Sequence, residues 1–264
     1  MILFIFIGII VFIIFFKNGG EKMSKINGDQ LYNGKKWANY RIGDVVKLPS
    51  FLFDENPHNL LYHLYSFKGS LAEEFLKRKY PSFLGNINSK SDLNKIDKAG
   101  LKKYIDENDE SLKNDFGLLN TIINERKKNE NIDKNTLILH IRIGDVICWY
   151  ENGKKGKNSW ENADFYSKQW NVEWWNGVLD YINKNSITKI IIIAGEHRNM
   201  CLEKSAAYIK DRLSFLKQKT NVPIELRLGH SPDEDILLVS NANHFITTGG
   251  GYGDLLKNIS TKFV

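Results

Sequence analysis

Apolar positions in the second half of the chain follow two periods in alternation. Runs of β-branched and aliphatic residues predict buried strands over residues 136–141, 188–194, 222–228 and 243–248. Between and after these runs, apolar residues at helical spacing predict helices over residues 173–184, 202–217, 231–242 and 254–259. Because strands and helices alternate, the pattern predicts an α/β fold with a parallel, Rossmann-like sheet covered on both faces.

The chain before residue 133 has a less regular pattern. Ser70 and Glu73 form a capping box ahead of a predicted helix over residues 71–80, and residues 111–128 also have helical spacing. Strands and helices do not alternate in this part of the sequence. We therefore expect a smaller, helix-rich lobe over 18–132, followed by the α/β domain over 133–264.

The first residues are uniformly apolar up to Lys17, and residues 1–17 are predicted to form an uncleaved, single-pass membrane anchor. The apolar run before Lys17 would form a helix about 24 Å long, somewhat shorter than the roughly 30 Å hydrocarbon core of a bilayer. A cleaved signal peptide is the alternative, and a start at Met23 would remove the segment altogether. Lys17, Lys22 and Lys25 follow the segment, so the positive-inside rule places the main domain on the cytoplasmic side.

The composition indicates a folded protein and argues against one class of partner, nucleic acid. Hydrophobic residues make up 42% of the chain and charged residues 26%, which is typical of a folded globular protein. The net charge of +6 comes from scattered lysines, and the absence of basic runs interleaved with aromatics argues against nucleic acid as a partner. Cys148 and Cys201 match no metal-binding spacing and are predicted to be buried free thiols.

The pentapeptide RIGDV occurs twice, at Arg41 and at Arg142, and only the second copy follows a predicted strand. That copy reads His140-x-Arg142-x-Gly144-Asp145 and lies at the carboxyl end of its strand, where open α/β sheets bind ligands. An arginine there is suited to clamp a diphosphate, and a glycine allows a sharp turn. Asp145 has three open roles: it orients Arg142, accepts a proton, or caps the turn. The first copy is treated as coincidence or a turn.

The second candidate motif is FITTGGGYGDLL, in which a strand, two hydroxyl residues, a glycine loop and a helix start follow one another. Such a sequence is typical of an anion cradle made of backbone N–H groups. It has neither the Gly-Lys-Ser/Thr of a Walker A loop nor the third glycine of a dinucleotide fingerprint. Its candidate binding residues are Thr247, Thr248, Gly249, Gly250, Gly251 and Tyr252. Together with Arg142 they predict one shared phosphate site.

These motifs in this order resemble the C-terminal, nucleotide-sugar-binding half of GT-B fucosyltransferases. The likeness covers about residues 136–259 and is to the α-1,2/α-1,6 and protein O-fucosyltransferase superfamily. It implies that Arg142 contacts the β-phosphate of a GDP-sugar, that His140 lies near the nucleotide, and that the Thr247–Gly251 segment lines the pyrophosphate. It also implies ribose or guanine contacts from Gly195, Glu196, His197 and Asp235.

The resemblance implies a membrane-anchored, metal-independent glycosyltransferase that needs no cofactor. The donor would be GDP-fucose or another GDP-sugar, the acceptor a glycan or protein hydroxyl held by the N-terminal lobe, and Arg142 and Asp145 the catalytic residues. Ile143 replaces the second arginine common in the family motif, so a catalytically inactive, membrane-tethered nucleotide-sugar-binding protein is one alternative. A metal-dependent GT-A transferase is another, because Asp233-Glu234-Asp235 is an Asp-x-Asp triplet.

Overall fold

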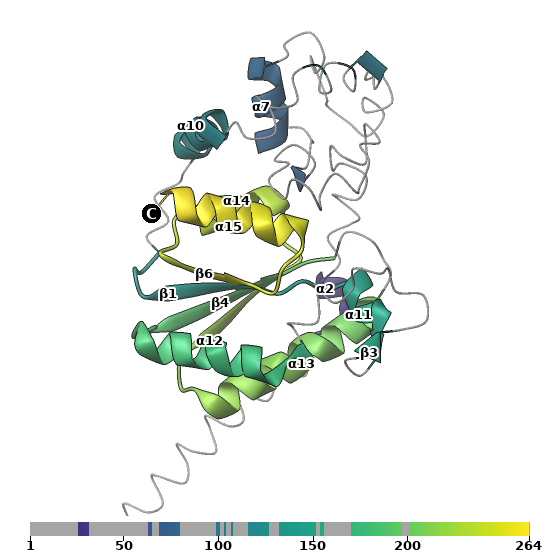
Figure 1. Ribbon diagram of the computed structural model, residues 1–264, viewed down its shortest axis with the longest axis vertical. Coiled ribbons are helices and arrows are strands. Elements are labelled where there is room, and N and C mark those ends of the chain that lie inside the picture. Colours follow the sequence, from purple (N-terminus) through teal and green to yellow (C-terminus); the bar gives the residue numbers. More distant parts are fainter. Residues whose placement is uncertain are drawn as a thin grey trace, which may run out of the picture.

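The computed structural model has a parallel sheet of four strands at its centre (Figure 1). It describes residues 26–31, 63–64, 69–79, 99–100, 103, 107, 116–126, 132–151, 154–155, 170–196 and 201–263. The strands of the sheet, in spatial order, are β5 (Ile224–Leu228), β4 (Lys189–Ala194), β1 (Thr136–His140) and β6 (His244–Thr247). The α/β fold with a parallel sheet is therefore confirmed, and every strand lies within its predicted range.

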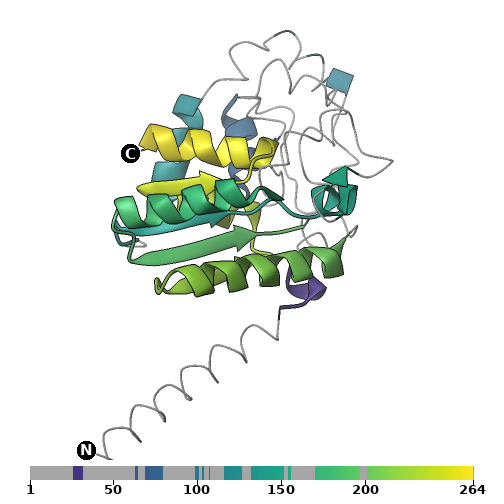
Figure 2. The same cartoon turned by 60° about the horizontal axis from the view of Figure 1, so that its bottom comes forward.

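Helices cover both faces of this sheet. On one face lie α12 (Val172–Lys184) and α13 (Leu202–Lys219), and on the other α14 (Pro232–Val239) and α15 (Gly251–Phe263) (Figures 1 and 2). The chain runs from β1 through β4 to β5 and then returns to the opposite side of β1 with β6. In open parallel sheets such a reversal leaves a crevice outside the carboxyl ends of the two flanking strands. Here those strands are β1 and β6.

The alternation of side chains across the sheet divides the core in two. Leu137 and Leu139 pack with α12 and α13, where Trp175 is fully buried, whereas Ile138 packs with α14 and α15. Full burial of an aliphatic side chain of this size contributes about 1.5–3 kcal/mol. Because both faces are covered, β1 is buried at every position rather than at alternate ones.

The predicted capping box at Ser70 is confirmed in part: the Glu73 N–H donates to Ser70 Oγ at 2.9 Å, and the Glu73 carboxylate accepts the Gly69 N–H. Helix α14 begins with a complete capping box, in which the Ser231 N–H donates to Glu234 Oε2 at 3.0 Å and Pro232 lies in the first turn. Several helix boundaries differ from the prediction, and in the last helix both do, because α15 ends at Phe263 instead of residue 259 and begins at Gly251 instead of residue 254. The Asp254 N–H donates to the Gly250 carbonyl at 2.9 Å and closes the first turn there.

The helices before residue 132 include α2 (Gly28–Leu31), α7 (Leu71–Lys79) and α10 (Phe116–Arg126). The last two confirm helices at the predicted places. They share the apolar core of α14 and α15, whereas α2 packs on α13 at the opposite face. Arg126 joins the ends of α7 and α10, since its Nη1 donates to the Gly69 carbonyl at 2.6 Å. The division at residues 132 and 133 stays a prediction.

After β1 the chain forms α11 (Asp145–Trp149) and a short antiparallel pair, β2 (Tyr150–Glu151) with β3 (Lys154–Lys155). The predicted anchor, residues 1–17, lies outside the described residues. Among the helices that are described, none combines the length and apolar character needed to cross a bilayer.

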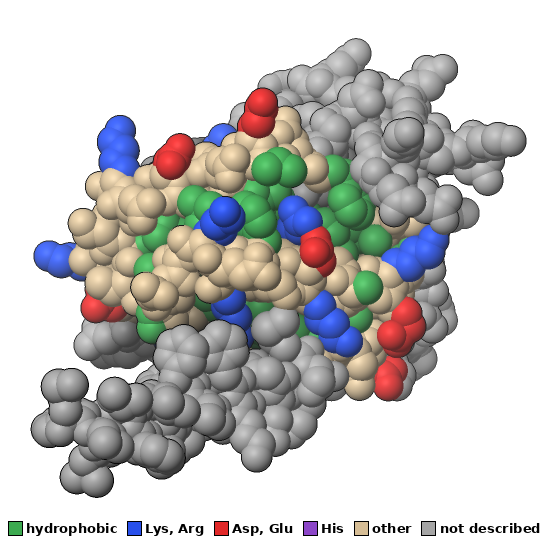
Figure 3. All heavy atoms as spheres, turned by 90° about the horizontal axis from the view of Figure 1, so that it is seen from below, with side chains coloured by type: hydrophobic (Ala, Val, Ile, Leu, Met, Phe, Trp, Pro, Cys, Tyr) green, Lys and Arg blue, Asp and Glu red, His purple; other side chains and the backbone are tan. Residues whose placement is uncertain are grey.

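The lysines whose exposure the structure describes are exposed or partly exposed. On the side of α12 and α13, basic and acidic side chains are mixed with apolar ones (Figure 3). Exposed charged residues on these two helices include Glu173, Asp180, Lys184, Lys204, Asp211, Lys217 and Lys219. Because both signs occur together, this part of the surface does not form the single-sign patch that binds nucleic acid.

Candidate functional site

The two predicted motifs leave the sheet side by side at the switch point between β1 and β6. His140 and Thr247 are paired in the β1–β6 register. Beyond the strands, the Thr248 N–H donates to the His140 carbonyl at 3.0 Å, and the Arg142 N–H donates to Thr248 Oγ1 at 2.8 Å. The predicted juxtaposition of the arginine turn and the glycine loop is confirmed.

The Arg142 side chain lies along the backbone of Gly250. A Cβ atom built on Gly250 would be 3.1 Å from Arg142 Cδ and 3.3 Å from Nε, and Gly250 has a φ of +87°. The next residue, Gly251, begins α15, and the first N–H groups of a helix have no acceptor within it. A guanidinium and a helix N-terminus therefore converge at one place, and both favour an anion.

Asp145 holds the guanidinium from the other side. Arg142 Nη2 donates to Asp145 Oδ1 at 2.6 Å, and the same oxygen accepts the Val146 N–H at 3.0 Å. The side chains of the pair are 22% and 17% exposed, so the ion pair is only partly screened by water. Gly144 turns the chain with a φ of +84°, as its position predicted. Of the three open roles of Asp145, these contacts favour orienting Arg142 and capping the turn.

His140 is buried beneath the start of α15. Its Nδ1 lies 2.9 Å from Thr247 Oγ1, and its ring meets that of Tyr252 edge-on at 5.9 Å. Burial, and secondarily the charge of Arg142, lowers the pKa of His140 to about 3. The imidazole is therefore neutral at physiological pH and acts as a hydrogen-bonding group rather than as a charge. Gly253 admits the Thr247 hydroxyl, because a Cβ there would overlap Thr247 Oγ1.

A further residue, His63, reaches the site from the chain before residue 132. It is 7% exposed, and a Cβ on Gly251 would overlap its imidazole ring. The sequence gives no sign of this position, since His63 lies in the mainly apolar run LLYHLYSF and has no partner at a metal-binding spacing. The glycines of α15 thus make room for side chains that come from three separate segments.

The described residues at the end of β4 make contacts within the fold. Gly195 follows the strand directly, and Glu196 is only 3% exposed. Glu196 Oε1 accepts the Cys201 N–H at 3.0 Å, and Oε2 accepts from Ser205 Oγ at 3.3 Å. This carboxylate therefore stabilises the start of α13, and its contact with a nucleotide stays a prediction. His197 lies outside the described residues.

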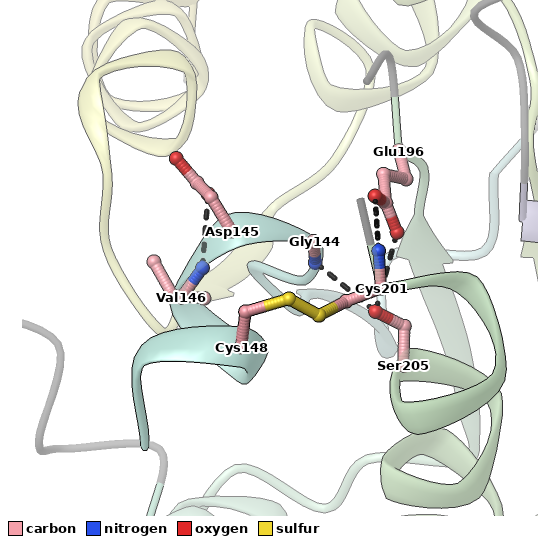
Figure 4. The surroundings of a disulfide bond; sticks show 7 residues. All are labelled: Gly144, Asp145, Val146, Cys148, Glu196, Cys201 and Ser205. Carbon is pink, nitrogen blue, oxygen red and sulfur yellow. Dashed lines mark hydrogen bonds between the residues drawn. A yellow bond between two sulfur atoms is a disulfide. The ribbon is translucent and has the colours of Figure 1, made fainter. Parts of the chain in front are cut away.

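Cys148 and Cys201 form a disulfide, so the prediction of free thiols is wrong (Figure 4). Their Cα atoms are 5.9 Å apart although the residues are separated by 53 positions. The physical reason is topological. Cys148 lies on the helix after β1 and Cys201 at the start of the helix after β4, and these neighbouring parallel strands end at the same edge of the sheet.

The three acidic residues at positions 233–235 of α14 have different environments, and Asp233 and Glu234 cap different helices. Asp233 Oδ2 accepts the Leu71 N–H at 2.7 Å and caps α7, whereas Glu234 caps its own helix. Burial raises the pKa of Asp233 to about 7 and that of Asp235 to about 8. Within the described ranges, no three His, Cys, Asp or Glu side chains are grouped as metal ligands. The triplet is thus explained by helix capping and burial.

Tyr252 ties the site to this helix, since its hydroxyl donates to the Pro232 carbonyl at 2.6 Å. Asp235, predicted to help hold the nucleotide, is buried on α14, and the nearby charge of Arg227 partly offsets its raised pKa. The contact of Asp235 with a nucleotide stays a prediction.

Comparisons with protein-family models, curated proteins and solved structures gave no match to this chain.

Proposed function

We propose that this chain binds the diphosphate of a nucleotide sugar between the ends of β1 and β6 and transfers the sugar without a metal. The observation that carries the proposal is the placement of the Arg142 side chain along Gly250, at the first turn of α15. A guanidinium supplies several N–H donors in a planar fork, and the helix start supplies backbone N–H groups. Both match the oxygens of a diphosphate at a topological switch point, where such ligands bind.

The proposed reaction is a displacement at the anomeric carbon. An acceptor hydroxyl forms the new C–O bond while the bond to the diphosphate breaks, and the diphosphate leaves with the electron pair. Arg142 and the first N–H groups of α15 stabilise the charge that develops on the leaving group. The hydroxyl proton passes to a carboxylate, for which Asp145 is the candidate. Its ion pair with Arg142 supports an orienting role as well.

By its resemblance to fucosyltransferases, the donor is proposed to be GDP-fucose or another GDP-sugar, and the acceptor a hydroxyl of a glycan or protein. Residues 1–17 are proposed to anchor the enzyme to a membrane. A nucleotide-sugar-binding protein without catalysis is the second candidate. The observation in its favour is Ile143, which takes the place of an arginine and is 1% exposed, so that position brings no second positive charge to the ligand.

A thermal-shift panel of GDP, UDP, GDP-fucose and guanosine on the purified full chain tests the proposal. Ligand at 100 times its Kd should stabilise the fold by about 2.7 kcal/mol, which corresponds to roughly 5–10 °C in Tm. We expect GDP and GDP-fucose to give this shift and UDP to give less. Arg142→Ala should abolish it, whereas Arg78→Ala, a change at an exposed arginine on α7, should leave it intact. Equal shifts in both variants would overturn the proposal.

Turnover separates the two candidate functions. Release of GDP from GDP-fucose, lost in Arg142→Ala and kept in Arg78→Ala, supports the transferase. Tight binding of GDP-fucose with no release of GDP, measured over a range of glycan acceptors, supports the binding protein instead.

A further inference from the structure

The turn after β1, which carries Asp145, is held in place by contacts that the proposed reaction does not use (Figure 4). The Gly144 N–H donates to Ser205 Oγ at 3.1 Å, and the Ser205 hydroxyl donates to Glu196 Oε2 at 3.3 Å. Ser205 is fully buried and Glu196 nearly so. A chain of hydrogen bonds thus connects the end of β4, the first turn of α13 and the turn after β1.

The disulfide makes a second connection between the same two segments. Asp145 is the first residue of α11 and Cys148 lies on the same short helix, whereas Cys201 is the N-cap residue of α13, one turn before Ser205. The Gly144–Cys148 segment is therefore attached to the start of α13 at both of its ends, by a hydrogen bond and by a covalent bond. Asp145 lies between these attachments.

The fit at Gly144 is tight. A Cβ atom there would be 3.1 Å from Glu196 Cγ and 3.2 Å from Cδ, in a backbone conformation that side chains rarely adopt. The turn is therefore fixed against the Glu196 side chain. Any displacement of this turn moves Asp145, and with it the partner of the Arg142 guanidinium.

We propose that Ser205, Glu196 and the Cys148–Cys201 disulfide are positioning residues for Arg142. They hold the Gly144–Cys148 turn against α13, so that Asp145 directs the guanidinium toward the start of α15. The ligand in this inference is the diphosphate of the proposed function, on which it rests for its binding readout. Charge-assisted bonds depend steeply on geometry, so diphosphate affinity depends on residues that do not touch the diphosphate.

A positioning role and a purely structural role differ in which part of the ligand they affect. Loss of positioning weakens only the contacts to the phosphates, so it lowers affinity for GDP and leaves affinity for guanosine unchanged. A general loss of structure lowers the affinity for both ligands to the same degree. The ratio of the two affinities is therefore the decisive measurement.

The experiment is calorimetric titration of the full chain with GDP and with guanosine. The variants are Ser205→Ala, the double change Cys148→Ser with Cys201→Ser, and Ser214→Ala as a matched control. Ser214 lies on the same helix, but its hydroxyl bonds the Lys210 carbonyl at 2.9 Å, away from the site. We expect Ser205→Ala and the double variant to lose about tenfold in GDP affinity, the effect of 1.4 kcal/mol. Guanosine binding should stay constant, and Ser214→Ala should match wild type for both ligands.

Wild-type protein that binds GDP no better than guanosine would overturn the proposed function. In that case amide hydrogen exchange still tests whether Ser205 holds the turn, because this measurement needs no ligand. Ser205→Ala should accelerate exchange at Gly144 relative to Ser214→Ala, because it removes the acceptor of that N–H. The same measurement serves if the double cysteine variant does not fold. Unchanged exchange at Gly144, or an equal loss of affinity for GDP and guanosine, would overturn the inference.

Discussion

Removal of the disulfide by the double change Cys148→Ser with Cys201→Ser should destabilise the fold substantially. The bond joins residues 53 positions apart. In the chain-entropy account, a crosslink of that span lowers the entropy of the unfolded chain enough to stabilise the native state by about 4 kcal/mol at 25 °C. The free energy of unfolding of a domain is only about 5–15 kcal/mol in total, so the double variant should lose a large part of it. Serine replaces each sulfur with a group of similar size, so the core is little changed.

Urea unfolding followed by circular dichroism measures this loss. With an m-value of about 3 kcal/mol/M, a change of 4 kcal/mol moves the unfolding midpoint down by about 1.3 M. Ser214→Ala is the matched control and should unfold at the wild-type midpoint. Alkylation under denaturing conditions should find no reactive thiol in the wild-type chain until reductant is added. A midpoint shift below about 0.3 M, or two freely alkylated cysteines, would show that the reasoning is wrong.

Three further outcomes follow from single contacts. Gly250→Ala should cost about 1 kcal/mol or more in the free energy of unfolding and reduce the GDP-induced Tm shift, because its Cβ would lie 3.1 Å from Arg142 Cδ at a φ of +87°. Asp235→Asn should be neutral near pH 4 and stabilising near pH 9 in pH-dependent thermal unfolding. Burial raises the folded-state pKa of Asp235 to about 8 from 3.8, so wild type loses stability as pH rises through that interval and the variant does not. Finally, disulfides persist in oxidising compartments, so maleimide should label neither Cys148 nor Cys201 in intact cells. Labelling of both would support the cytoplasmic side that the lysines near residue 17 predict.

The periodic pattern predicted most of the α/β half because its strands are buried on both faces. β1 is buried at every position and β4 at all but its first, and α12 places Trp175, Val178 and Ile182 on one stripe. The rule that parallel strands end at one edge was enough to place Arg142 and the glycine loop at the same edge. That they are immediate neighbours depends on the strand order, which local sequence does not encode.

The features that the sequence did not reveal depend on contacts between distant segments. Cys148 and Cys201 have no spacing that marks a pair, and they meet only because β1 and β4 are adjacent. His63 likewise reaches the site through the packing of the chain before residue 132. The sequence pattern predicted a later start for α15 because a glycine in a helix interior destabilises the helix by about 1 kcal/mol relative to alanine. At Gly251 and Gly253, packing against neighbouring side chains overrides that preference.

The glycine run therefore has an explanation that needs no ligand. Gly250 accommodates Arg142, Gly251 accommodates His63, and Gly253 accommodates the Thr247 hydroxyl. A bare backbone that already makes room for side chains is weak support for a phosphate cradle. The case for an anion then depends on Arg142, whose guanidinium is placed at a helix start by Asp145, within a turn fixed to α13. An arginine held so firmly yet still 22% exposed has donors to offer a ligand. This is why the decisive substitutions lie at Arg142 and at the contacts behind its turn, and not among the glycines.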